Sequence, residues 1–355
     1  MSKIQSRNIS IDILKILSMV MVIILHTKTY GLKGVNLTPS DGLYWIVWTL
    51  QFLSIVAVNC FVLISGYFTS ASIPSPKKLF KLWLQVEIFS VGIYLILCTI
   101  PDSGVEFGFA QLLAHILPVI CDRYWFFTCY IILMILAPLL NRFIDTMAQK
   151  EFKRCVLTLL SLFVLLPSIN LYSNSFGTSK GYSVIWFIIL YFVAAYLRRY
   201  PLPQKPYGVF YLAITVISIF ANTILEKLSN TLDLFEKARE ILSMYNGITV
   251  FVASVCLFLF FTHHPIQSEK TSAKLFTRIV AASFSVYLIH DHPAIRNVLW
   301  NDLIKLYEVT DSIPQYLLRL FITVFSIFVI GIIVGMVLNI LIYNTEKLIK
   351  KIKRK

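Results

Sequence analysis

The chain has 355 residues, of which 57% are hydrophobic and only 14% are charged. Its mean hydropathy is +0.76. An average soluble domain carries about 25% charged residues, so the composition excludes a soluble globule and predicts an integral membrane protein. The net charge of +14 is spread over many segments, which favours a role in membrane topology over nucleic-acid binding by a basic patch.

Stretches long enough to cross a bilayer recur along the whole chain, since a spanning helix needs about 20 mostly apolar residues. Ten are found, at roughly 9–27, 44–68, 79–100, 124–143, 155–171, 183–199, 207–225, 244–262, 279–300 and 315–343. The last exceeds the bilayer thickness, so it is expected to tilt or to continue beyond the membrane. We expect an all-α polytopic protein with about ten transmembrane helices. Residues 1–345 would form a single membrane domain, followed by a basic tail at 346–355.

The positive charges predict the orientation, because Lys and Arg collect in cytoplasmic loops. With the N-terminus inside, the inner segments hold 21 of the 32 Lys and Arg residues and the outer segments hold eight. This pattern fits ten spans with both termini in the cytoplasm. The tail "EKLIKKIKRK" is expected to lie on anionic lipid headgroups.

The first span carries three polar residues in "IDILKILSMVMVIILH", namely Asp12, Lys15 and His26. At 100° per residue they share one face of a helix, with Asp12 and Lys15 one turn apart as an ion pair. Lys15 and His26 are separated by about 16 Å along the axis, so they are not direct partners. Charged residues inside a membrane indicate function. The alternatives are a lysine that snorkels to the inner surface and an interfacial histidine.

A second polar group occurs in the ninth span, "SFSVYLIHDHPAIR", with Tyr287, His290, Asp291 and Arg296. His290 would lie about 17 Å deep, in the outer half of the membrane, at a depth similar to that of His26. Two such histidines suit proton transfer. The alternative is a structural hydrogen-bond pair between helices. A metal site using His290 and His292 is not expected, because the two side chains point about 200° apart and no further ligand cluster is present.

Three smaller features complete the candidates. Ser65 and Gly66 close the second span, where a small pair permits close helix packing. Arg123 and Trp125 open the fourth span, either as an interfacial anchor or as a platform on which a sugar acceptor stacks. The six cysteines lack a C-x-x-C pair and are interpreted as small apolar residues, with a disulfide between Cys98 and Cys121 as an alternative.

Four of these motifs, in order, resemble the membrane-bound acyltransferase 3 family of bacterial ten-span proteins that O-acetylate extracytoplasmic glycans. "DILKILSMVMVIILH" is similar to its D-x-x-R/K…H signature, "FVLISGYF" to its F-x-x-S-G-F/Y motif, "YWFFTCYIILMILAPLL" to its W-F/Y-x…P span, and "FSVYLIH" to its Y-L-x-H motif. The resemblance covers about residues 7–300. Lys15 stands where arginine is more frequent. The protein is expected to work alone or with a separate partner in place of the extracytoplasmic hydrolase-like domain that the long family members carry.

The resemblance implies transfer of an acyl group, most simply acetyl, from cytoplasmic acetyl-CoA to a hydroxyl of an exopolysaccharide, capsule or lipid-linked oligosaccharide at the bacterial cytoplasmic membrane. No tightly bound cofactor, metal or nucleic acid is expected, and the sequence does not indicate an oligomeric state. His26 and His290 are the catalytic candidates. The substrate-binding and CoA-binding candidates are Asp12, Lys15, Ser65, Arg123, Trp125, Tyr287 and Asp291.

Two other functions compete with this interpretation. A transporter or flippase for a lipid-linked sugar would use the same charged face as a substrate path, but internal repeats and helices broken in corresponding halves are not evident. A glycan polymerase is less favoured, because the outer loops offer no large catalytic segment.

Overall fold

A computed structural model describes residues 9–101, 103–170, 177–229, 231–266 and 272–352. All regular elements among these residues are helical, which confirms the predicted all-α class. The α-helices are α1 (Ile9–His26), α2 (Gly42–Ser54), α3 (Ala57–Thr69), α4 (Pro76–Thr99), α5 (Phe109–Ile116), α6 (Trp125–Asp145), α7 (Gln149–Leu160), α8 (Leu166–Ile169), α9 (Val184–Arg199), α10 (Tyr207–Ser229), α11 (Asp233–Leu242), α12 (Ile248–His263), α13 (Ser272–His290) and α14 (Ile313–Ile352).

Shorter helical turns join these elements. Three are π-helical, at Thr27–Gly31, Ser161–Leu165 and Val298–Ile304, and two are 3₁₀ turns, at Ser179–Gly181 and Leu306–Val309. The described residues of the ten predicted spans are mostly helical, and the span at 44–68 is divided between α2 and α3. Seven helical segments among the described residues are long and apolar enough to cross a membrane, and α12 and the apolar part of α13 are shorter. The chain is therefore a multi-pass membrane protein.

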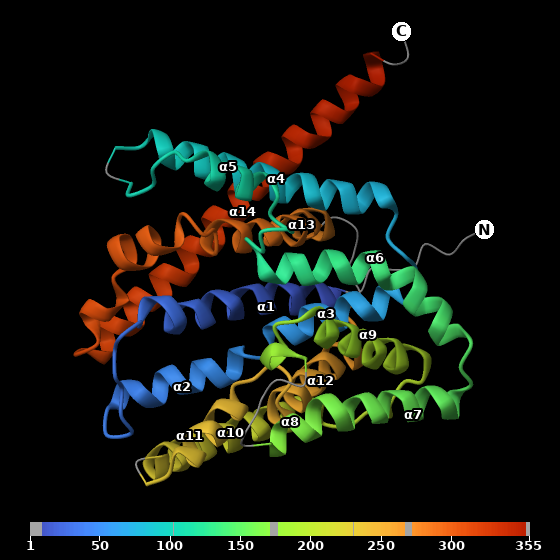
Figure 1. Cartoon of the computed structure of the whole chain (residues 1–355), viewed down its shortest axis with the longest axis vertical. Coiled ribbons are helices and arrows are strands. Elements are labelled where there is room, and N and C mark those ends of the chain that lie inside the picture. The colour runs from blue at the N-terminus through green and yellow to red at the C-terminus, as the bar shows by residue number, and fades with distance from the viewer. Residues whose placement is uncertain (1–8, 102, 171–176, 230, 267–271, 353–355) are drawn as a thin grey trace.

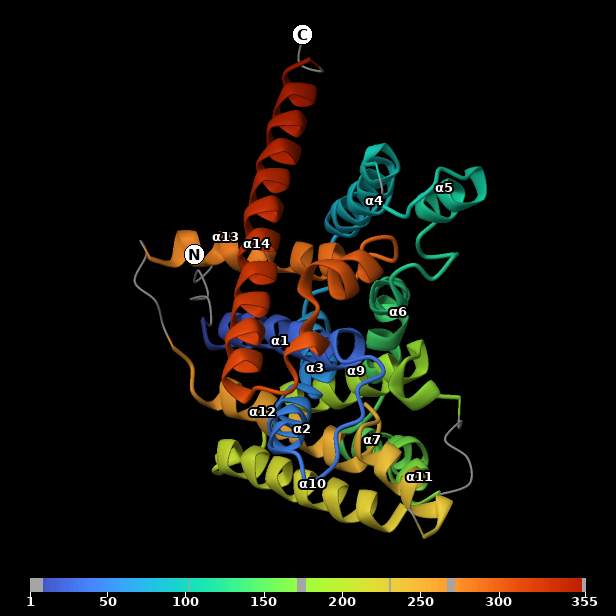
Figure 2. The ribbon, with the colours of Figure 1, turned by 90° about the vertical axis from the view of Figure 1, so that its left-hand side faces the viewer.

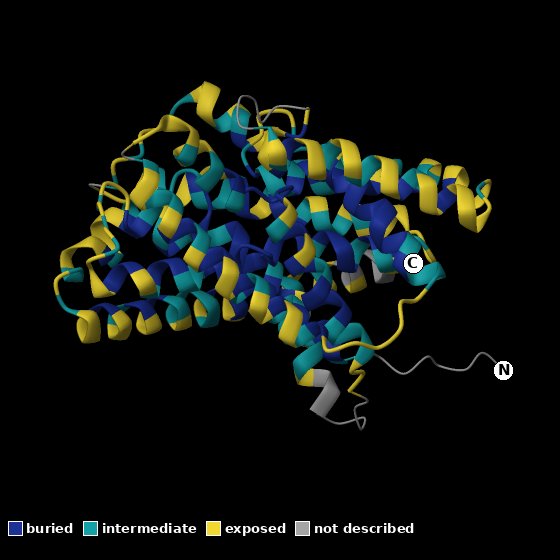
Figure 3. Ribbon diagram, turned by 90° about the horizontal axis from the view of Figure 1, so that it is seen from below, coloured by how far each residue is buried: buried dark blue, intermediate teal, exposed yellow. Residues whose placement is uncertain are grey.

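Helix α1 occupies the middle of the bundle, where it packs against α2, α3, α12, α13 and α14 (Figures 1 and 2). Its buried side chains include Leu14 and Ile23, which have no exposed surface. Helices at the periphery instead expose large apolar side chains, such as Ile135 and Phe321, and the exposed positions lie around a buried centre in Figure 3. Apolar side chains on this outer surface suit contact with lipid. Polar residues on α1 are thus held inside protein, away from the acyl chains.

The last helix, α14, has 40 residues and therefore spans about 60 Å, roughly twice the thickness of the hydrocarbon core. Its C-terminal part projects from the bundle (Figure 2). The predicted span at 315–343 is thus part of a longer helix that leaves the bundle. It also extends helix through the predicted basic tail as far as Ile352; residues 353–355 lie outside the described residues.

One expectation is wrong in detail. The predicted span at 279–300 is not one helix, because α13 ends at His290 and the backbone N–H of Ala294 donates to Nδ1 of His292 at 3.1 Å. Arg296 consequently lies after the helix and not within it. The alternative disulfide is also absent, since Cys98 and Cys121 are both free.

Candidate active site

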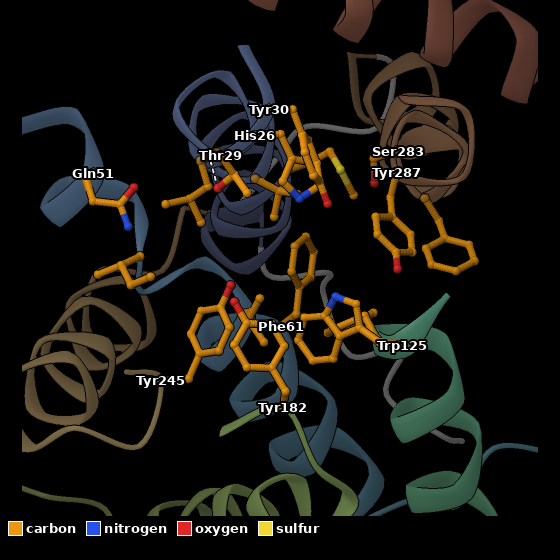
Figure 4. A pocket seen from close by; sticks show the side chains of 17 residues that line it. His26, Thr29, Tyr30, Gln51, Phe61, Trp125, Tyr182, Tyr245, Ser283 and Tyr287 are labelled. Atoms are coloured by element: carbon orange, nitrogen blue, oxygen red, sulfur yellow. Dashed lines mark hydrogen bonds between the residues drawn. The ribbon is translucent and has the colours of Figure 1, made fainter. Parts of the chain in front are cut away.

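A cavity of about 170 Å³ lies beside α1 in the middle of the bundle. It is lined from six parts of the chain: α1 with the π-turn after it, the α2–α3 region, the start of α6, the segment before α9, the segment before α12, and α13. Figure 4 shows His26 and Tyr30 on one side and Trp125, Tyr182 and Tyr245 on the other. One polar ring, that of His26, thus faces a mostly aromatic wall.

The two histidines singled out in the sequence meet at this cavity. Nε2 of His290 lies 3.0 Å from Nδ1 of His26, and the ring centroids are 5.0 Å apart. The other ring nitrogen of His290, Nδ1, lies 2.5 Å from the carbonyl oxygen of Val286. His290 is completely buried, whereas His26 is partly exposed to the cavity. The buried His290 ring therefore holds the His26 ring, which is open to the cavity.

The hydrogen-bond chain assigns the tautomers. A carbonyl only accepts, so Nδ1 of His290 carries a proton and donates it to Val286. In the neutral ring Nε2 of His290 is then an acceptor, and it takes the Nδ1–H of His26. Nε2 of His26 keeps its lone pair, and it has no hydrogen bond among the described residues. This is the arrangement of a general base whose tautomer is fixed by a second group.

Local structure explains the placement of both rings. His26 is the last residue of α1, where the helix changes to the π-turn Thr27–Gly31, and such π segments often occur at functional sites. On the other side, a Cβ added at Gly331 of α14 would lie 2.7 Å from Cα of Val286. Only glycine allows α14 to approach α13 so closely, and this contact holds the turn of α13 whose carbonyl orients His290.

A polar network joins Tyr30, at the wall of the cavity, to residues beyond the end of α13. The hydroxyl of Tyr30 donates to Oδ1 of Asp291 at 3.3 Å, and Nη2 of Arg296 lies 3.3 Å from the same oxygen. The Arg296 guanidinium also covers the Tyr30 ring at 4.9 Å. Asp291 is buried and bound by protein groups, so its contacts link the π-turn after α1 to the segment after α13.

At the other end of α1, Nζ of Lys15 lies 3.3 Å from Oδ1 of Asp12, as the spacing predicted. The Asp12 side chain is only 5% exposed, while that of Lys15 is 33% exposed. Lys15 does not line the cavity. It lies near the start of α1, whereas His26 is the last residue of that helix. The polar face of α1 thus has a charged end and a histidine end.

Comparison with known proteins agrees with the site. A family model described as "Acyltransferase domain", of the acyltransferase 3 type, matches residues 8–344. The chain belongs to the acyltransferase 3 family. No curated protein and no solved structure gives a significant match.

In this acyltransferase 3 family member, the remaining predicted site residues divide between the cavity and its surroundings. Trp125 and Tyr287 line the cavity. Ser65 does not; it lies on α3 and hydrogen-bonds the Tyr130 side chain. Arg123 is also outside the cavity and lines a separate hollow of about 880 Å³ together with His115.

The hollow around Arg123 contains a stack of rings that includes His292. His115 lies parallel to His292 at 5.0 Å, and Nε2 of His292 donates to the carbonyl of Ser90 at 3.0 Å. Burial and, to a smaller extent, the charge of Arg123 lower the pKa of the His115 imidazole to about 4. His292 thus fixes the turn after α13 while His290 contacts His26, so the two side chains have different partners.

Sequence reasoning missed two aromatic residues that line the cavity. Tyr182 and Tyr245 lie in segments before α9 and α12, and their rings are 4.9 Å apart. The Tyr182 ring lies 4.5 Å from that of Trp125, and the backbone N–H of Tyr245 donates to the carbonyl of Lys180. The available signal was an aromatic residue just before an apolar span in "KGYS" and "MYNG", the same pattern that singled out Trp125.

Proposed function

We propose that this protein transfers an acyl group, most simply acetyl, from cytoplasmic acyl-CoA to a hydroxyl of an extracytoplasmic polysaccharide or cell-surface glycan, in a bacterial cytoplasmic membrane. The observation that carries the proposal is the His26–His290 pair, which leaves a basic ring nitrogen at the wall of a cavity in the membrane domain. Membership of the acyltransferase 3 family supplies the reaction class.

The proposed step uses His26 twice. Nε2 of His26 removes the proton from the acceptor hydroxyl as its oxygen attacks the thioester carbonyl. The carbon–sulfur bond then breaks, and the proton on His26 passes to the departing CoA sulfur, so the ring returns to its starting state. The positive charge on His26 is stabilised by the lone pair of Nε2 of His290, 3.0 Å away. His290 is a positioning residue in this scheme, because it acts through His26.

The aromatic wall suits a sugar acceptor. Trp125, Tyr182 and Tyr245 present ring faces and hydroxyl groups opposite His26 (Figure 4). Rings of this kind pack against the apolar C–H face of a sugar, while their polar atoms bond its hydroxyls. This supports a glycan acceptor bound between the aromatic wall and His26.

The proposal is tested with purified protein in lipid nanodiscs supplied with acetyl-CoA, by measuring release of CoA and transfer to a soluble glycan fragment. His26→Ala is expected to abolish both activities while thermal unfolding stays close to wild type. His264→Ala is the matched control, because His264 is exposed and bonds only the carbonyl of Phe260 through its ring. Normal turnover by His26→Ala would contradict the proposal. Translocation of a lipid-linked sugar without acyl-CoA would support the transporter alternative.

A further inference from the structure

A groove of about 870 Å³ runs along α14, between this helix and the turns that follow α13. Its walls are mainly the end of α13, the turns Val298–Ile304 and Leu306–Val309, and α14 from Gln315 to Ile330. Most of the lining side chains are aliphatic, and two of them, Leu318 and Ile330, are 61% and 56% exposed. The groove is therefore open at the apolar outer surface of the bundle, where lipid surrounds the protein.

The inner end of the groove is closed where α14 crosses α13 (Figure 2). A Cβ added at Gly331 would lie 2.7 Å from Cα of Val286. One turn further, a Cβ added at Gly335 would lie 2.8 Å from the carbonyl oxygen of Ala282. Helices in contact this close leave no room for a chain beyond Ile330, the last groove residue on α14. The groove thus opens toward the start of α14, which the predicted orientation places outside.

Two cations stand at the outer end of the groove. Nζ of Lys305 lies 3.5 Å from Oε1 of Glu308, and Nη1 of Arg319 lies 3.6 Å from Oε2 of the same carboxylate. All three side chains line the groove and are between 39% and 44% exposed. Two positive charges thus share one negative charge, which leaves a positive group that a ligand can reach.

The backbone holds the two cations beside each other. Lys305 ends the turn Val298–Ile304 in the left-handed conformation, with φ of 48°, and its carbonyl accepts a hydrogen bond from Nη1 of Arg319 at 2.9 Å. Residues other than glycine adopt this conformation rarely, and often where a ligand is held. The fold therefore builds the cationic end of the groove from two separate segments.

The distance from the cations to the closed end matches one leaflet of a bilayer. Arg319 and Ile330 are eleven residues apart on α14, which is about 16 Å along the helix axis. The hydrocarbon core of a bilayer is about 30 Å thick, so the apolar part of the groove is about half as long. A lipid with its phosphate at the cations would extend its chain along α14 as far as the closed end.

We propose that this groove binds an anionic phospholipid of the outer leaflet, with its phosphate at Lys305 and Arg319 and an acyl chain along α14. The planar guanidinium of Arg319 suits contact with two phosphate oxygens, and the Lys305 ammonium adds a point charge. His290 also lines the groove, so the acyl chain would exclude water from the ring that positions His26. The site binds lipid whether or not the proposed acyl transfer is correct.

The test measures which lipid the purified full chain retains. Native mass spectrometry of protein released from nanodiscs of equal phosphatidylglycerol and phosphatidylcholine should show phosphatidylglycerol bound in preference. Lys305→Gln and Arg319→Gln are each expected to reduce this preference by about fivefold, the factor for one cation at an anionic membrane surface. Arg319→Lys should keep most of it. Lys227→Gln is the matched control, because Lys227 is an exposed cation near the end of α10 and lies outside the groove.

A second variant tests the apolar part of the groove. Ser326 lines the groove on α14, so Ser326→Trp would fill the space of the acyl chain and leave both cations in place. Retention of phosphatidylglycerol should be lost, and this lipid should no longer raise the midpoint of thermal unfolding as it does for wild type. Leu341→Trp adds the same ring to an exposed position of α14 outside the groove and should behave as wild type.

Three outcomes would overturn the assignment. The first is equal retention of the two lipids by the wild type. The second is an unchanged preference for phosphatidylglycerol in Lys305→Gln and Arg319→Gln, or unchanged retention in Ser326→Trp. The third is displacement of phosphatidylglycerol by an equal concentration of a polyprenyl phosphate in a manner that depends on Arg319, which would assign the groove to a lipid-linked sugar in place of a phospholipid.

Discussion

Nε2 of His290 and Nδ1 of His26 lie 3.0 Å apart, although the two residues are 264 positions apart in the chain. The contact joins the end of α1 to the end of α13, and the carbonyl of Val286 holds the far nitrogen of His290. A pair of neutral imidazoles linked in this way leaves one basic nitrogen, on His26. The role that we propose for each ring follows from this direction of the hydrogen bonds.

Replacing His290 by alanine should reduce catalysis while preserving substrate binding. His26 would lose the acceptor for its Nδ1–H and the group that stabilises its protonated form. We expect kcat to fall by about 100-fold, with KM for acetyl-CoA within a factor of about two of wild type, since His290 acts through His26 and does not line the cavity. Steady-state kinetics in nanodiscs measures both. A rise in KM at unchanged kcat would show that His290 contributes to binding instead.

Replacing Gly331 by alanine should destabilise the protein. The added methyl group would lie 2.7 Å from Cα of Val286, so α13 and α14 must separate, at a cost of about 1–3 kcal/mol. Gly92→Ala is the matched control, because a Cβ there meets no atom within 4 Å. Thermal unfolding in detergent is expected to show a lower midpoint for Gly331→Ala and no decrease for Gly92→Ala. Equal midpoints would mean that α14 can shift without cost.

Replacing Trp125 by alanine should weaken acceptor binding. Trp125 lies in the aromatic wall at 4.5 Å from Tyr182, and an aromatic contact contributes about 0.5–1.5 kcal/mol. KM for a glycan acceptor should therefore rise by about three- to tenfold, while release of CoA in the absence of acceptor is unchanged. Trp83→Ala removes a tryptophan on the outer surface of α4 and serves as the control. An unaltered acceptor KM would remove Trp125 from the acceptor site.

Acidification should destabilise the ring stack around His115. The folded protein holds the pKa of His115 at about 4 through burial and the Arg123 charge, whereas an unfolded histidine titrates near 6.5. The unfolded chain therefore binds more protons between these values, and the free energy of unfolding decreases as pH falls from about 6.5 toward 4. His115→Phe should reduce the loss of unfolding midpoint between pH 7 and pH 5. The same loss in both proteins would assign the acid sensitivity to other groups.

Much of the fold could be predicted because hydropathy and charge act locally along the chain. The all-helical membrane architecture follows from hydropathy and charge, and the Asp12–Lys15 pair follows from helix periodicity. The break after His290 was missed, since a run of apolar residues does not reveal the turn that His292 fixes through Ser90 and Ala294.

The site could be predicted only in part. Periodicity assigns a residue to a face of its own helix, but not to the helix that this face meets. Contact between His26 and His290 depends on how α1 and α13 pack, and on the close approach at Gly331. Tyr182 and Tyr245 enter from connecting segments whose positions are set by tertiary contacts. The same reason explains why Arg123 and Trp125, two positions apart, face different cavities.

The most direct test of the account is the mass of the surface glycan in cells that lack this gene and are complemented with either wild type or His26→Ala. Mass spectrometry should detect an ester, of acetyl mass if the donor is acetyl-CoA, after complementation with wild type. The ester should be missing with His26→Ala at equal membrane abundance. The same ester level with both proteins would contradict the central role of His26.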